Sequence, residues 1–204
     1  PSNSFNVPRK SLTLVQDGGR YFWYALEGQG LFQYDFKGDT THHYSDAPAY
    51  FYTSLYSHDS TEQFFGSNNG VFSYSFKNNQ LEKINSVVNG TSLGSYVGNS
   101  SRDIHGSCWF SMDEGLLCVT KNGEINAVVA ERFLPSTLIY TLNSDLYGNL
   151  IVGTNKGITV IKVDQEGNAI TSNTYNVENG FNGYETHMRS SFKTDKGQIF
   201  VGTL

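Results

Sequence analysis

The sequence feature that most constrains the fold is a pattern that recurs four times along the 204-residue chain. Each copy contains short apolar runs separated by tight turns, which is the pattern of antiparallel strands. A glycine followed by an apolar residue marks the same point in every copy. These glycines are Gly30, Gly70, Gly115 and Gly157, at intervals of 40, 45 and 42 residues. A period of this length with several short strands is typical of β-propeller blades.

Other positions keep the same spacing from the repeat glycine. An aromatic or apolar residue stands six or seven positions before it, a small residue stands four before it, and a turn aspartate stands six before the aromatic position. His58 replaces the aspartate in the second copy, and Ile151 replaces the tryptophan in the fourth. A fifth, incomplete copy contributes Gly202 at the position of the small residue. Besides the four glycines above, the repeat residues are therefore Asp17, Trp23, Gly66, Asp103, Trp109, Asp145, Gly153 and Gly202.

The sequence therefore predicts an all-β chain, a β-propeller fragment with four complete four-stranded blades and a partial fifth. No stretch shows helical periodicity. Aromatic residues make up 14% of the chain and there are 21 glycines, which suits pleated surfaces joined by turns. The predicted blades are residues 12–44, 52–84, 95–129, 138–175 and, for the partial one, 187–204. The inner strand of the third blade is predicted at 95–99, and residues 85–93 are predicted to be a polar connection.

The fifth copy supplies two strands, so we expect an open array with an exposed edge at 200–203, completed by another copy or by further chain. The alternative is a strained five-bladed ring in which residues Ser4–Val7 cover part of that edge.

Composition excludes several classes of partner. The net charge is −5 and no basic stripe exists, so a nucleic-acid surface is not expected. No apolar run approaches the roughly 20 residues needed to span a bilayer, so we predict no membrane span in this segment. No cofactor-binding motif or metal-ligand spacing is present, and the sequence predicts neither a cofactor nor a metal.

The two cysteines, Cys108 and Cys118, flank the turn between the second and third strands of the third blade. If that turn is centred on Asp113, they lie opposite each other across the hairpin. Free, packed thiols are one interpretation. A disulfide is the other, and it requires an oxidising compartment.

The recurring polar and aromatic residues have structural interpretations beside functional ones. An aspartate that recurs once per blade is expected to accept hydrogen bonds from backbone N–H groups of its own turn, rather than to act as a catalytic or metal carboxylate. Trp23 and Trp109 are expected to pack between blades, although a sugar ring could stack on either. Gly66, Gly153 and Gly202 are expected where a side chain would crowd a neighbour.

A ligand site is predicted on one face. The first strand of a propeller blade lines the central channel, so the turns after the second and fourth strands emerge on the same face. That face carries aromatic and hydrogen-bonding side chains, which sugar recognition requires. The candidate ligand-binding residues are Tyr50, Tyr52, Asn68, Glu114, Arg132, Asn155, Lys156, Glu185 and His187.

The unit Asp-x-x-Gly-x-x-Trp-x-Gly-Thr-x-x-Gly-Leu resembles the two-component-regulator propeller repeat. It is best matched by residues 145–157 and by Asp103, Trp109 and Gly115. Residues 179–185, followed by 195–197 and 200–203, look like the last blade of such propellers. This repeat builds the extracytoplasmic sensor regions of hybrid histidine kinases in Bacteroides-type bacteria. A small β-sandwich, a membrane helix and a kinase would follow in that family.

The resemblance implies a periplasmic sensor that binds a glycan or another small-molecule ligand and signals to a histidine kinase. It further implies a homodimer or self-association through the propeller, and no enzymatic activity in this segment. Two alternatives stay open. A carbohydrate-active hydrolase or lyase needs carboxylates or histidines clustered near the channel mouth. A protein-interaction propeller needs an exposed apolar patch.

Overall fold

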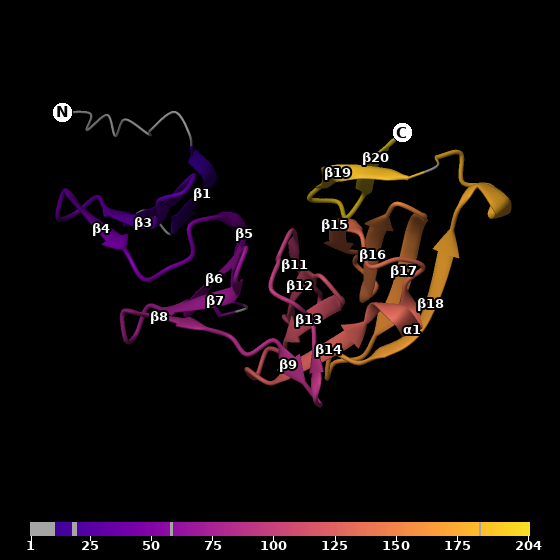
Figure 1. Cartoon of the computed structure of the whole chain (residues 1–204), viewed down its shortest axis with the longest axis horizontal. Helices are drawn as coiled ribbons and strands as arrows, with labels where there is room; N and C mark the ends of the chain where they lie inside the picture. The colour runs from indigo at the N-terminus through magenta and orange to yellow at the C-terminus, as the bar shows by residue number, and fades with distance from the viewer. Residues whose placement is uncertain (1–10, 18–19, 58, 184) are drawn as a thin grey trace.

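The computed structural model of the chain describes residues 11–17, 20–57, 59–183 and 185–204, with side chains for all but the first of these segments. Within them, four four-stranded antiparallel sheets each follow the order of the sequence, and a two-stranded sheet comes last. The predicted all-β propeller fragment is confirmed. Figure 1 shows the sheets arranged in an arc, with the first strand of each toward the centre and the fourth toward the outside.

The first blade contains β1 (Ser11–Asp17), β2 (Tyr21–Leu26), β3 (Gly30–Asp35) and β4 (Thr40–Tyr44). The second contains β5 (Phe51–Tyr56), β6 (Glu62–Ser67), β7 (Gly70–Ser75) and β8 (Gln80–Lys83). The third contains β11 (Ser100–Arg102), β12 (Cys108–Met112), β13 (Gly115–Val119) and β14 (Ile125–Val129). The fourth contains β15 (Ile139–Ser144), β16 (Asn149–Thr154), β17 (Gly157–Val163) and β18 (Ala169–Tyr175). The partial fifth contains β19 (Thr186–Lys193) and β20 (Ile199–Thr203).

Helical structure in the described residues is limited to α1 (Ala130–Phe133) and the 3-10 turn η1 (Val177–Asn179). Within the described ranges, no helix has the length and apolar character that a membrane crossing requires.

Apolar cores fill the space between consecutive blades. Between the first two blades, the Trp23 ring lies 4.9 Å from Phe65 and 4.7 Å from Tyr74, centroid to centroid. Trp109, from the third blade, is fully buried in one cluster with Leu150 and Ile161 of the fourth. The repeated tryptophan position therefore joins one blade to the next, and neither ring is available to stack on a ligand.

The repeat glycines have a backbone conformation that L side chains rarely adopt. Gly30, Gly70, Gly115 and Gly157 all have positive φ, from 91° to 150°. At Gly115 and Gly157 a Cβ atom would also overlap the backbone carbonyl oxygen of Val128 and Tyr175 respectively. These oxygens lie at or next to the last residue of the fourth strand. The glycine, which has no Cβ, therefore lets the turn after the second strand pack against the end of the fourth strand of the same blade.

The turn aspartates organise their own turns. The Asp103 carboxylate accepts hydrogen bonds from the backbone N–H groups of His105 and Ser107, at 2.9 and 3.0 Å, and from Trp109 Nε1, at 2.7 Å. Asp145 accepts three bonds from its own turn in the same way.

The second blade uses a shifted residue for this purpose. Asp59, one position after the aligned His58, accepts bonds from Ser57 Oγ and from the N–H and Oγ of Thr61. His58 lies outside the described residues, as do residues 4–7, which the ring-closing alternative requires, and the side chain of Asp17.

The inner strand of the third blade differs from its prediction at 95–99. β11 begins at Ser100, because the Asp113 carboxylate takes the N–H groups of Ser95 and Tyr96, at 2.8 and 3.0 Å. The N–H of Asn99 is bonded to Ser111 Oγ at 2.9 Å. Side chains of β12 and of the β12–β13 turn therefore hold this segment as a loop.

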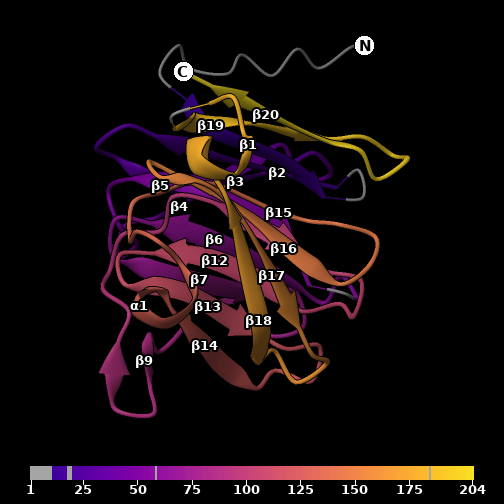
Figure 2. The same cartoon turned by 90° about the vertical axis from the view of Figure 1, so that its right-hand side faces the viewer.

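The connection predicted at 85–93 contains a small hairpin, β9 (Val87–Val88) paired with β10 (Thr91–Ser92). Asn89 and Gly90 both have positive φ, 51° and 80°, which matches the two-residue turns that close hairpins. Figure 2 shows this hairpin projecting beyond the blades.

The cysteine geometry corrects the expectation that the two residues face each other. The β12–β13 turn is centred between Asp113 and Glu114, so Cys118 pairs with Trp109, and Cys108 pairs with Val119. Neighbouring positions of a strand point to opposite faces. Cys108 therefore packs in the core shared with the second blade, and Cys118 in the core shared with the fourth. Both are free and buried.

Candidate ligand-binding site

In each of the first three blades, the turn after the second strand lies beside a connecting segment. This segment leads either to the next blade or into the inner strand of the same blade. The N–H of Gly28 donates to Ala49 O at 3.1 Å, and the N–H of Asn68 donates to Tyr50 O at 3.2 Å. In the third blade the N–H of Glu114 donates to Leu93 O at 3.1 Å. These bonds define one side of the molecule, which we call the connection face.

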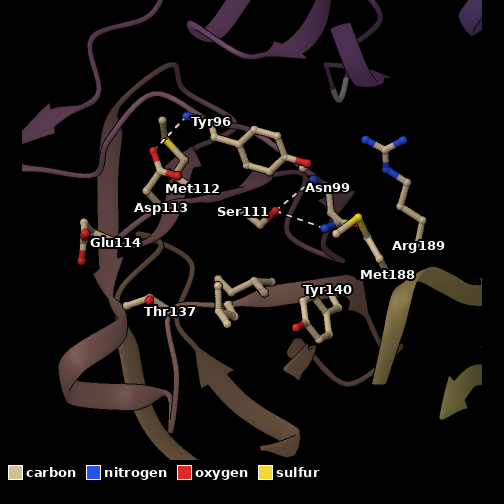
Figure 3. A pocket seen from close by; sticks show the side chains of 13 residues that line it. Tyr96, Asn99, Ser111, Met112, Asp113, Glu114, Thr137, Tyr140, Met188 and Arg189 are labelled. Atoms are coloured by element: carbon tan, nitrogen blue, oxygen red, sulfur yellow. Dashed lines mark hydrogen bonds between the residues drawn. The ribbon is translucent and has the colours of Figure 1, made fainter. Parts of the chain in front are cut away.

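A pocket of about 370 Å³ opens on the connection face (Figure 3). It is lined by the loop before β11, the β12–β13 turn, the start of β15 and part of β19. It therefore lies where the third, fourth and fifth blades meet. Its lining includes the aromatic, polar and charged side chains of Tyr96, Asn99, Asp113, Glu114, Tyr140 and Arg189.

Irregularities in the inner strands place several of these side chains. The β5–β6 register shifts between Phe51 and Thr53, and the β15–β16 register shifts between Ile139 and Thr141. The residues left without a pairing partner are Tyr52 and Tyr140. Bulges of this kind occur beside functional sites because they re-aim a side chain.

The irregularity in β19 is larger. Thr186 pairs with Thr203 and Ser191 with Val201, so residues 187–190 stand opposite a single residue of β20. Arg189, inside this bulge, has φ of 56°, an uncommon conformation for a long side chain. The bulge carries Arg189 and Met188 to the pocket wall.

An aromatic and cationic cluster borders the pocket. The Tyr52 ring lies 5.0 Å from the Tyr96 ring, and Arg189 Cζ lies 5.2 Å from the Tyr52 centroid. Burial raises the pKa of the Tyr52 hydroxyl above its ordinary value, with Tyr96 adding to the rise and the Arg189 charge opposing it. Tyr52 is therefore neutral near pH 7 and holds Tyr96 and Arg189 in place.

The polar groups of the pocket fall into two kinds. Asp113 and the Ser111–Asn99 pair are engaged in the hydrogen bonds that shape the loop before β11. By contrast, the side chains of Glu114 and Arg189 line the pocket and form no ion pair with the described residues. These two are the charged side chains of the pocket that no ion pair within the described residues engages.

Three of the residues predicted from sequence lie at this pocket. Glu114 lines it, Tyr52 contacts two lining residues, and His187 belongs to the same bulge as Arg189. Tyr50 and Asn68 lie together at the entrance to the second blade, where they share a backbone hydrogen bond, and they do not line the pocket.

The other four predicted residues are spread over the connection face. Arg132 lies on α1, with its Cζ 5.1 Å from the Phe133 ring centroid. Asn155 and Lys156 form the β16–β17 turn, and Glu185 precedes β19. None of the four lines the pocket.

Four residues that line the pocket were not predicted from the sequence: Tyr96, Asn99, Tyr140 and Arg189. A signal for Tyr140 was present, because Ile139-Tyr140 places two large residues side by side and breaks the alternation of an inner strand. Phe51-Tyr52 breaks it in the same way.

A second cavity, of about 480 Å³, lies between the outer strands of the first two blades, where β4 and β8 supply its walls. His42, His43, Asp46 and Glu82 are among its lining residues. In the part of the chain that the structure describes, no group of three or more histidine, cysteine, aspartate or glutamate side chains is arranged to hold a metal ion.

No protein-family model matches the sequence, and no curated protein matches it. Solved structures do match. The extracellular domain of the hybrid two-component system BT3049 from B. thetaiotaomicron has a TM-score of 0.72 and 21% identity, covering 95% of this chain and 26% of that chain. The corresponding domain of BT4673 from the same species has a TM-score of 0.65 and 18% identity, covering 95% and 25%.

Propellers of other activity share the fold as well. Virginiamycin B lyase from Staphylococcus aureus has a TM-score of 0.68 and 10% identity, covering 95% of this chain and 63% of that chain. At such identities the similarity shows the fold alone. This chain spans about a quarter of the length of the two-component domains that it resembles.

Proposed function

We propose that this chain is part of an extracytoplasmic, periplasmic sensor propeller that binds an oligosaccharide and passes the signal to a histidine kinase. The observation that carries the proposal is the pocket of about 370 Å³ on the connection face. Its size suits a small saccharide, and it combines tyrosine rings with charged and amide groups.

The chemistry of the lining supports a sugar ligand. Sugar rings pack their C–H faces on aromatic rings, while their hydroxyl groups need hydrogen-bond partners at the ring edge. Tyr96, 37% exposed, offers a ring face, and Glu114 and Arg189 offer charged groups in the same pocket. The similarity of fold to extracellular domains of two-component systems is consistent with this assignment.

We further propose that the segment binds its ligand without converting it and that two copies associate in signalling. Of the two carboxylates at the pocket, Asp113 accepts two backbone N–H groups through its Oδ2, a structural role that disfavours its use as a second catalytic carboxylate beside Glu114. Glycoside hydrolysis generally requires such a pair. Light scattering with and without bound ligand tests the association.

The test is calorimetric titration with a panel of neutral and acidic oligosaccharides, followed by analysis of the sugars for products. We expect binding without products. Tyr96→Ala should weaken binding roughly tenfold, since a stacking surface is lost. Tyr147→Ala is the matched control, because Tyr147 is 86% exposed on a β15–β16 turn, outside the pocket. Product formation would support the enzyme alternative, and absence of binding across the panel would refute the proposal.

A further inference from the structure

We propose that the pocket selects an oligosaccharide carrying a single carboxylate, as a terminal uronic acid does, and that Arg189 receives this group. The inference rests on the proposed function and specifies its ligand. It follows from the placement of Arg189, from its lack of an acidic partner and from the charge at the opposite end of the pocket.

The position of Arg189 is fixed by its backbone and by its neighbour. The residue lies in the β19 bulge with φ of 56°, a conformation that persists only where surrounding structure holds it. Its guanidinium lies over the Tyr52 ring, with Cζ 5.2 Å from the centroid. A cation–π contact with a ring does not use the N–H donors at the edge of the guanidinium, so they remain for a hydrogen-bonding partner.

Arg189 differs from the other arginines that the structure describes. Arg20 forms an ion pair with Asp35 at 3.0 Å, and Arg102 donates to Ser57 O at 3.0 Å. Arg132 stacks on Phe133 but lies on α1, outside the pocket. Arg189 alone of these four lines the pocket, and no described carboxylate forms an ion pair with it. A guanidinium fork binds a carboxylate through two parallel hydrogen bonds, so a carboxylate is the ligand group that fits it.

The opposite end of the pocket sets a limit on ligand charge. Figure 3 shows Asp113 and Glu114 on the far side of the pocket from Arg189. Asp113 is occupied by two backbone N–H groups, while Glu114 forms no ion pair with the described residues. A carboxylate at this end accepts hydrogen bonds from sugar hydroxyl groups but repels a second acidic group. The pocket therefore favours one acidic group at one end of an otherwise neutral saccharide.

The experiment uses three probes with the same trisaccharide backbone: one neutral, one ended by a single hexuronic acid, and one with a uronic acid at each end. Calorimetry measures their dissociation constants for the native chain and for Arg189→Gln, Arg189→Lys, Arg132→Gln and Glu114→Gln. Melting temperatures verify that each variant is folded.

We expect the singly acidic probe to bind at least roughly tenfold more tightly than the neutral one, as suits a charge-assisted bidentate contact. Arg189→Gln should abolish this preference and Arg189→Lys should reduce it, while Arg132→Gln should preserve it. Glu114→Gln should strengthen binding of the doubly acidic probe.

Salt provides a readout that needs no variant. For the native chain, binding of the acidic probe should weaken from 0.02 to 0.5 M salt and binding of the neutral probe should not, because ions screen only the charged contact. Equal affinity for the neutral and acidic probes, or a preference that survives in Arg189→Gln, overturns the inference and leaves the proposed function intact. Failure of all saccharides to bind overturns both.

Discussion

Replacing Gly153 by alanine should destabilise the chain by about 2 kcal/mol, because the added Cβ has no space. The atom would lie 2.6 Å from Thr186 Oγ1, which is 0.8 Å short of the 3.4 Å at which ordinary contact begins, and it would also overlap Thr141 Oγ1. Both threonines are 1% exposed. Thr141 belongs to the same blade and Thr186 to the next, so neither can yield without disturbing a junction. Valine adds two methyl groups and should reach the upper part of the 1–3 kcal/mol typical of overpacking.

Thermal unfolding monitored by circular dichroism measures this effect. For a chain of this length, 2 kcal/mol corresponds to a fall in melting temperature of roughly 4–8 °C. Gly38→Ala is the control, because Gly38 has an ordinary φ and its Cβ would come no closer than 3.3 Å to Thr40 Oγ1. That change should be nearly neutral.

A double-mutant cycle identifies the cause. If the loss comes from contact with Thr186, then Gly153→Ala should cost less in the Thr186→Ala background, with a coupling of about 1 kcal/mol. Melting of Gly153→Ala that matches Gly38→Ala would refute the close-approach argument. Additivity in the cycle would assign the cost to another contact.

Three further outcomes are expected. Burial raises the pKa of Cys108 to about 12 and also raises that of Cys118; native protein at pH 8 should therefore give no reaction in a thiol titration, and both cysteines should react after unfolding. Hydrogen bonds within its turn, the largest from a backbone N–H, lower the pKa of Asp59 from 3.8 to about 2. The ionised Asp59 carboxylate therefore stabilises the folded state fully above pH 3.8, and this contribution is lost as the pH falls through about 2. NMR titration of the Asp59 carboxyl should show a midpoint near pH 2. In Asp59→Asn, the loss of folding stability between these pH values should be smaller. Asp103→Ala leaves Trp109 Nε1 buried without its acceptor and should cost about 2–3 kcal/mol by urea denaturation, whereas an unchanged midpoint would show that the bond does not contribute to stability.

The fold was predictable because the residues that set it recur for local reasons. Gly115 and Gly157 must adopt positive φ beside a backbone carbonyl, so no other residue fits there without strain. Asp103 must satisfy the N–H groups of a tight turn. Each of these requirements is met by residues of a single blade. The same residue types therefore recur at the blade period and can be recognised in a single sequence.

The site was less predictable because it depends on residues that depart from the repeat. Ser95 and Tyr96 occupy the position of an inner strand, but a carboxylate from the following hairpin holds them as a loop. Arg189 reaches the pocket because β19 has a long bulge, whose length depends on pairing with β20. A periodic pattern contains neither of these tertiary contacts. Of the nine predicted ligand residues, Glu114 alone lines the pocket.

The bulges separate residues near the pocket from the residues that maintain the repeat. The register shifts at positions 12, 52 and 140 occur near the start of β1, β5 and β15, and β19 carries its longer bulge near the same point. Tyr52 and Tyr140 have no pairing partner in the ladder, and neither belongs to the core clusters between blades. Substitution there can therefore change the pocket at small cost in stability, while the glycine and aspartate positions must stay fixed. On this reasoning, Tyr140→Ala should alter ligand affinity with less loss of stability than Gly153→Ala, and equal losses would show that the bulge residues also hold the blades together.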